Sequence, residues 1–332
     1  MQLSTVWFVL IAVLFTGYFV LEGFDFGVGM LLPVLARDER ERRVMINTIG
    51  PVWDGNEVWL ITAGAAMLAA FPEWYATLFS AFYLPLLLIL VALILRGVAF
   101  EYRGKRADPG WKRRWEAAIV FGSVVPALLW GVAFANIVRG VSLDAGHEYS
   151  GGLAGLLNPY ALLGGLTLLT VFALHGAVFL ALKTAGEIRE RAAALAARIG
   201  MVAGPLAVGF LAWTLLGQRR SAAAVALAVL AAVALVLGLV ATGAGREGWA
   251  FAGTAVSIAF TVGCLFAALF PDVLPSTAEP AGTLTTANAS ATPYTLRIMT
   301  WAAAVFAPIV LLYQGWTYWV FRRRIGASNI PD

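Results

Sequence analysis

Apolar runs of roughly 20 residues recur from one end of this 332-residue chain to the other. That is about the length that an α-helix needs to cross a hydrocarbon core of ~30 Å. Hydrophobic residues make up 61% of the chain and charged residues 13%, a balance that excludes a soluble domain. The sequence therefore predicts one all-α, multi-pass membrane domain that occupies residues 1–332.

Charged or Pro/Gly-rich breaks divide the apolar runs into nine predicted transmembrane helices. The expected ranges are 5–35, 48–71, 77–99, 116–138, 159–182, 199–217, 221–243, 250–271 and 294–321. The first run has neither a basic leader nor a small-residue cleavage site, so we expect it to stay as a helix. Only residues 218–221 separate the sixth range from the seventh. Eight helices, with one bent element at that point, is the alternative count.

The Lys and Arg residues predict the orientation of the helices. With nine spans, 19 of the 23 basic residues fall on one side of the membrane, and only Arg139, Arg219, Arg220 and Arg297 fall on the other. Because basic residues collect in cytoplasmic connections, the N-terminus is expected outside and the C-terminus in the cytoplasm. The net charge of +4 then reflects these connections rather than a nucleic-acid partner.

Four acids and one histidine fall inside the predicted spans. They are Glu22 and Asp25 in the first span, Asp54 and Glu57 in the second, and His175 in the fifth. Each acidic pair is three residues apart, so its members share one helical face. With a rise of about 1.5 Å per residue, all five groups fall in the cytoplasmic half of the membrane. A charge in hydrocarbon is costly, so such residues usually face protein or water and are functional candidates.

Carboxylates in a low-dielectric environment can exchange protons near neutral pH. We therefore expect a proton path from the cytoplasm through Asp54, Asp25, Glu57 and Glu22. The structural alternative is that Asp54 and Asp25 cap or connect broken helix ends, because Pro51 precedes Asp54. Polar support for the path is expected from Trp53, Asn56 and His175, although a buried histidine is more often an interhelical hydrogen-bonding residue.

The glycines of residues 23–29 include a Gly-xxx-Gly spacing at Gly23 and Gly27, which lets another helix approach closely. A dinucleotide-binding interpretation fails, because no strand precedes this segment and no βαβ unit surrounds it.

Few residues in the chain could hold a metal or a haem. The two histidines are His147, in a predicted outer loop, and His175, in a helix, so the chain cannot supply a buried bis-His haem site. Met67 and Met299 could serve as axial ligands, but a buried methionine is far more often packing. The single cysteine, Cys264, can form neither an intrachain disulfide nor a thiolate cluster. We expect no metal and no cofactor on this chain.

Several segments resemble subunit II of cytochrome bd-type quinol oxidases, and the Trp-Asp-Gly-Asn stretch that begins at Trp53 is the most specific. The similar segments, which run in order along nearly the full length, are residues 23–29, 42–47, 53–62, 96–103, 131–136, 157–159, 270–271 and 299–301.

The resemblance implies a fold of two four-helix bundles plus one further helix in a bacterial plasma membrane. It also implies a partner, subunit I, which carries two b-type haems and one d-type haem, takes electrons from quinol and reduces oxygen to water. The family assigns the aspartate that matches Asp54 to a proton channel along the subunit interface. Small single-helix subunits, lipids and a quinone bound in this subunit are further partners that the family allows.

The sequence departs from the family at two points. Glu57 stands where an amide is more usual, and the connection between the sixth and seventh helices is very short. Two other functions stay open: a proton-coupled carrier, which paired intramembrane acids would also serve, and a scaffold subunit without a proton path.

Overall fold

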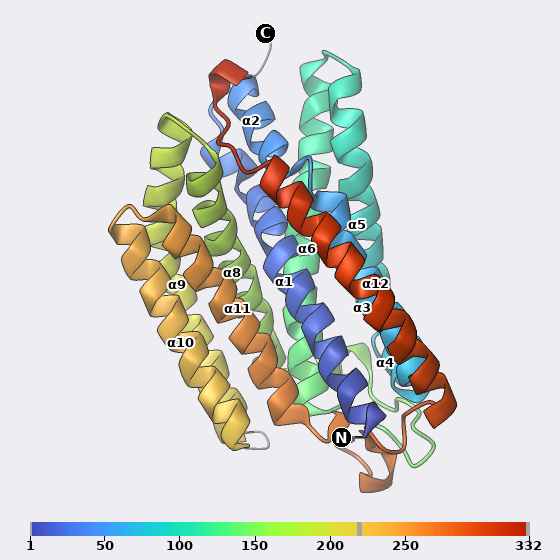
Figure 1. The fold of residues 1–332 in the computed structure, drawn as a ribbon. Coiled ribbons are helices and arrows are strands. Elements are labelled where there is room, and N and C mark those ends of the chain that lie inside the picture. The colour runs from blue at the N-terminus through green and yellow to red at the C-terminus, as the bar shows by residue number, and fades with distance from the viewer. Residues whose placement is uncertain (1, 218–220, 330–332) are drawn as a thin grey trace.

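The computed structural model describes residues 2–217 and 221–329, which form twelve α-helices and little else (Figure 1). The helices are α1 (Leu3–Leu35), α2 (Glu39–Ile49), α3 (Trp53–Ala70), α4 (Pro72–Ala81), α5 (Tyr83–Tyr102), α6 (Pro109–Arg139), α7 (Leu153–Leu156), α8 (Pro159–Lys183), α9 (Glu187–Gly217), α10 (Ala222–Gly243), α11 (Glu247–Leu269) and α12 (Pro293–Val320). Three short 3-10 helices are η1 (Arg103–Lys105), η2 (Pro280–Gly282) and η3 (Ala327–Asn329). Strands β1 (Asp272–Leu274) and β2 (Leu284–Thr285) pair antiparallel in the connection before α12.

Within the described residues, eight helices are long and apolar enough to cross a membrane. They are α1, α5, α6, α8, α9, α10, α11 and α12. The predicted span at 48–71 corresponds to α3, which has 18 residues and carries both Asp54 and Glu57 in its first two turns. The ninth crossing therefore stays a prediction.

Two predicted boundaries were wrong. The range 48–71 contains a break, because α2 ends at Ile49 and α3 begins at Trp53, with Pro51 between them. The range 77–99 also contains a break, at Phe82 between α4 and α5. In addition, α6 and α9 begin earlier than expected, because hydropathy does not detect the polar helical turns that project from the membrane.

The sixth and seventh predicted spans are two separate helices, α9 and α10, rather than one bent element. They pack against each other: a Cβ added at Gly200, early in α9, would lie 2.3 Å from a methyl group of Leu239, late in α10. The helices are therefore antiparallel neighbours. The predicted outer residues Arg219 and Arg220 lie outside the described residues.

Three long helices begin with the same local signal, a capping side chain followed by proline. Asp108, Asn158 and Thr292 each accept a hydrogen bond from the backbone N–H three residues later, at 2.7, 3.0 and 3.3 Å. The next residue is proline, which lacks the N–H that would be unpaired at this position and has its φ preset for the helix.

Helix α1 lies at the centre of the molecule and contacts α3, α6, α8 and α11 (Figure 1). Its tightest approach is to α8: a Cβ added at Gly27 would lie 2.1 Å from the carbonyl oxygen of Phe172 and 2.6 Å from the Cα of Gly176. The close approach expected from the Gly-xxx-Gly spacing is confirmed at Gly27, and only glycine fits there.

Helix α12 lies across α1 and α3 and is almost entirely exposed, yet polar bonds fix it near both ends (Figure 1). Near its start, the indole Nε1 of Trp7 donates to the Thr300 hydroxyl at 3.1 Å and to the Leu296 carbonyl at 3.3 Å. Beyond its end, the backbone of Ile325 pairs with Lys183 and Ala185 just after α8. Hydrogen bonds therefore fix both ends of a helix that buries little apolar surface.

At the end of the bundle rich in basic residues, ion pairs connect α2, α6 and η1. Arg103 contacts Glu39 at 2.6 Å and Glu116 at 2.5 Å, Lys112 contacts Glu39 at 2.8 Å, and Arg42 contacts Glu116 at 3.3 Å. Burial opposes ionisation of Glu39, but the hydrogen bonds from Arg103 and Lys112 outweigh it and lower the pKa of this carboxyl below its ordinary value.

Candidate functional site

A buried ionic cluster lies inside the bundle, where α1, α3 and α5 meet. Its centre is an ion pair between the guanidinium of Arg96 on α5 and the carboxylate of Glu22 on α1, and neither side chain is exposed. The Arg96 Cζ atom also lies 4.7 Å from the centre of the Phe26 ring, a cation–π distance. An intramembrane acid thus has its counter-charge on a neighbouring helix.

Two further acids belong to the cluster. Glu57 on α3 lies 3.6 Å from Arg96, so one guanidinium faces carboxylates from two other helices. Asp25, one turn from Glu22 on the same face of α1, is fully buried and accepts a hydrogen bond from the amide of Asn56 at 2.6 Å. Three carboxyl groups therefore share one cationic side chain.

Asn56 connects this cluster to the last helix. Its amide nitrogen donates to Asp25, while its carbonyl oxygen accepts from the Tyr318 hydroxyl at 2.7 Å and the Gln314 amide at 3.4 Å. Trp59 Nε1 in turn donates to Gln314 at 2.8 Å. Polar side chains thus run without interruption from α1 through α3 to α12.

Asp54 does not join the cluster directly. It lies in the first turn of α3, where it is exposed and accepts a hydrogen bond from its neighbouring backbone N–H at 2.7 Å. A carboxylate at that position also interacts favourably with the positive end of the helix dipole. Glu57 follows three residues later on the same side of the helix, so the two carboxylates are neighbours on the surface of α3.

The two remaining predicted site residues are on opposite sides of α1. Trp53 packs on Phe100, with ring centroids 5.1 Å apart, beside the cluster on α5. His175 is fully buried against α1 and α11: one ring nitrogen lies 3.1 Å from the Val20 carbonyl and the other 2.7 Å from the Thr254 hydroxyl. The carbonyl can only accept, so that ring nitrogen is protonated, and the other is occupied by Thr254. His175 therefore connects α8 to α1 and α11 through contacts at both ring nitrogens.

The residues Arg96, Gln314 and Tyr318 were not among the site residues predicted from the sequence. The structure places Arg96 inside α5, fully buried. A signal was present, because Glu22 and Asp25 in an apolar helix require a cation or a proton donor on a neighbour, and Arg96 falls within the expected third span. For Tyr318 no comparable signal exists, since it follows from the crossing of α12 over α3.

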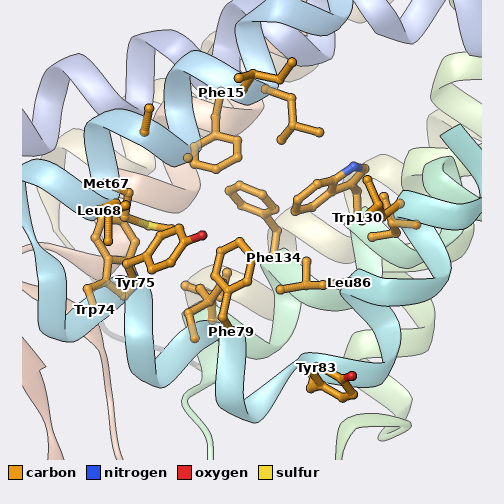
Figure 2. A pocket seen from close by; sticks show the side chains of 18 of the residues that line it. Phe15, Met67, Leu68, Trp74, Tyr75, Phe79, Tyr83, Leu86, Trp130 and Phe134 are labelled. Carbon is orange, nitrogen blue, oxygen red and sulfur yellow. The ribbon is translucent and has the colours of Figure 1, made fainter. Parts of the chain in front are cut away.

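A second feature is an apolar cavity of about 550 Å³ between α3, α4, α5 and α6, away from the ionic cluster (Figure 2). Its aromatic lining is Phe15, Trp74, Tyr75, Phe79, Tyr83, Trp130, Phe134 and Phe266. Ile61 and Tyr83 are exposed, so the cavity opens to the surface between α3 and α5. It suits a long apolar ligand. Among the described residues, no group of three His, Cys, Asp or Glu side chains could hold a metal ion.

A charge-compensated acidic cluster within a bundle of membrane-length helices defines a class, the polytopic membrane proteins that carry ionisable groups inside the bilayer. The particular family follows from comparison. The model of the cytochrome bd terminal oxidase subunit II family matches residues 3–321, and the chain belongs to this family.

Known relatives cover the whole chain. It is 43% identical over 331 residues to the cytochrome bd ubiquinol oxidase subunit 2 of Bacillus subtilis (strain 168), an alignment that covers 98% of this chain and 97% of that protein. It is 36% identical over 365 residues to the cytochrome bd-I ubiquinol oxidase subunit 2 of Escherichia coli (strain K12), covering 99% and 96%. The fold is similar to a chain in the structure of bd oxidase from Geobacillus thermodenitrificans, with a TM-score of 0.77, 18% identity, and 97% and 99% of the two chains covered.

Proposed function

We propose that this chain is the haem-free subunit of a bacterial quinol oxidase and conducts protons to the oxygen-reducing site of its partner. In this proposal it spans the plasma membrane nine times, with its N-terminus outside and its basic end in the cytoplasm. The partner, a haem-bearing subunit I, holds two b-type haems and one d-type haem, oxidises quinol and reduces oxygen to water.

The observation that carries the proton path is the continuity of the acids. Asp54 is on the surface of α3, Glu57 follows on the same side, and Glu57 reaches the buried Arg96, which also holds Glu22. Within the described residues, Glu22 Oε2 and Arg96 Nε and Nη2 make no hydrogen bond to protein. Such atoms can be bridged by water molecules that pass protons onward.

The surface around Asp54 supports a partner at this point. Val58, Ile61 and Leu68 continue the same side of α3 and are 48%, 69% and 50% exposed, so a polar acid stands at the end of an apolar stripe. An apolar helix face of this kind meets either lipid or another subunit. A path that starts at Asp54 would therefore run along the contact with subunit I.

The proposal assigns the haems to the partner, and the contacts of the two histidines in this chain support it. His175 has both ring nitrogens engaged, and His147 lies in a loop where its Nδ1 contacts the Gly282 carbonyl at 3.0 Å. Expression of this chain alone should therefore give a membrane protein with almost no haem absorbance, and stoichiometric haem would contradict this part of the proposal.

The proton path is tested in the complex purified with its partner. Asp54→Asn should lower quinol-driven oxygen uptake roughly tenfold while the haem content stays complete. Glu190→Gln, a change at an exposed acid with no ion pair in the described residues, is the matched control and should leave uptake unchanged. If Asp54→Asn retained full uptake with full haem content, the chain would be a scaffold without a proton path.

The alternative function, a proton-coupled carrier, is supported only by the acids within the helices, whereas nearly the whole chain matches an oxidase subunit. The aromatic cavity favours one additional role, the binding of a quinone or lipid tail (Figure 2). Solvent extraction of the purified complex should then recover such a molecule, and replacement of Ala65, in the cavity wall, by Trp should reduce the amount.

A further inference from the structure

A second surface hollow, of about 500 Å³, lies between the last turns of α1 and the first half of α6. We call it the α1–α6 groove. Its apolar lining is Leu32 and Pro33 from α1 and Ala117, Val120, Phe121, Val124 and Val125 from α6. Arg113 and Glu116 line its end nearest the start of α6, at the basic end of the bundle.

The two charged residues at this end of the groove differ in whether an opposite charge lies beside them. Glu116 contacts Arg103 at 2.5 Å and Arg42 at 3.3 Å, so its negative charge is already compensated. Arg113 is exposed and makes no ion pair with any of the described residues. The groove therefore combines an apolar channel with one uncompensated cation, a combination complementary to an amphipathic anion.

The length of the groove indicates which kind of molecule fits it. From Arg113 to Val125 is about 18 Å along α6, close to the ~15 Å of one leaflet plus the headgroup level. A single-helix subunit would need an apolar surface across both leaflets, about twice this length. A phospholipid needs only one leaflet, with its phosphate at the level of the first turns of α6.

We propose that the α1–α6 groove binds one anionic phospholipid of the leaflet at the basic end of the protein. The phosphate contacts the Arg113 guanidinium, and one acyl chain lies along Val120, Val124 and Pro33. None of the groove residues is an acid of the proton path, and the proposal does not depend on that path.

The binding is measured by native mass spectrometry of the purified oxidase complex, delipidated and titrated with dioleoylphosphatidylglycerol. Arg113→Gln should weaken the tightest lipid adduct about fivefold, the effect of one cation near a headgroup. The matched control is Arg114→Gln, an exposed arginine one position away that does not line the groove, and it should bind the lipid as the wild type does. Dioleoylphosphatidylcholine should bind more weakly than dioleoylphosphatidylglycerol to the wild type but equally to Arg113→Gln.

A groove-filling variant tests the acyl part independently. Val124→Trp should abolish the tight adduct while the surface charge is unchanged, and an excess of inorganic phosphate should not displace the lipid. Equal losses in Arg113→Gln and Arg114→Gln would show diffuse surface attraction and overturn the site. If Val124→Trp bound the lipid as the wild type does, the proposed lipid site would also be overturned. It would likewise be overturned if the wild-type complex retained a small protein subunit that the Val124→Trp complex lost.

Discussion

Arg96 on α5 and Glu22 on α1 form an ion pair in which neither side chain is exposed at all. A charge removed from water loses several kcal/mol of hydration, so such a pair persists only because each partner compensates the other. Glu57, at 3.6 Å from the same guanidinium, adds a second carboxylate that is still 23% exposed. The cluster thus runs from a closed interior pair to an acid at the surface of α3.

Removal of the central cation should damage the fold more than removal of the whole pair. Arg96→Gln leaves Glu22 buried without its counter-charge and should destabilise the protein by about 3–5 kcal/mol. The double variant Arg96→Gln, Glu22→Gln should recover part of this loss, because the fully buried Glu22 carboxylate is no longer present without its counter-charge. Thermal unfolding of the purified complex measures both, with Arg114→Gln as the control. Strictly additive effects would show that the two groups do not interact.

The two carboxylates that face Arg96 should differ in importance. Glu22→Gln removes the closer and fully buried partner, whereas Glu57→Gln removes a partly exposed one and should change stability by less than about 1 kcal/mol. We therefore expect Glu57→Gln to assemble with full haem content but with lowered oxygen uptake per haem, because Glu57 lies on the proposed proton path, and Glu22→Gln to assemble poorly. Haem per complex and uptake per haem are the measurements, and the opposite order would contradict the geometry.

The contact between α1 and α8 should tolerate no added methyl group. Gly27→Ala places a Cβ against backbone atoms of Phe172 and Gly176, which cannot rotate away. The helices must then separate, and a loss of about 1–3 kcal/mol is expected. Gly209→Ala in α9 has no atom within 4 Å of the new Cβ and should be neutral or slightly stabilising. Equal melting temperatures for the two variants would refute the close approach.

Acid should weaken the ion pairs at the basic end through Glu39. Because its pKa is lowered in the folded protein, its contribution to stability is present above its ordinary pKa of about 4.5 and is lost as the pH falls through the folded value. The melting temperature of the wild type should exceed that of Glu39→Gln at pH 7, and the difference should disappear toward pH 3. The side chain is 41% exposed, so the difference should be small.

The sequence predicted most of the helices because hydrophobic length is a local property. It also predicted that Glu22 and Asp25 share one face of their helix and that Asp54 and Glu57 share one face of theirs, since spacing along a helix sets a shared face. It could not predict the break at Phe82, which depends on how α4 turns against its neighbours. It indicated that Glu22 and Asp25 need a cation, but it could not show that Arg96 pairs with Glu22, because that pair joins residues 74 positions apart on different helices.

The sequence also could not predict that Asp54 lies apart from the buried cluster. Asp54 and Glu57 share a side of α3, yet only Glu57 reaches Arg96, because the position along the helix decides which acid meets α5. The role of Asn56 was expected only as polar support. Its position as the bond between Asp25 and Tyr318 follows from the crossing of α12, which no local pattern encodes.

The hydrogen bonds between Trp7 and α12 also constrain how the protein is made. Their partners are separated by 289 and 293 positions, so at roughly 5–20 residues per second the ribosome needs about 15–60 s after Trp7 to supply them. During that time α1 is already in the bilayer while Asn56 lacks Tyr318. During synthesis there is thus a stage in which α1 is present but its hydrogen-bond partners on α12 have not yet been made. A chain truncated before α12 should be recognised and degraded by membrane proteases.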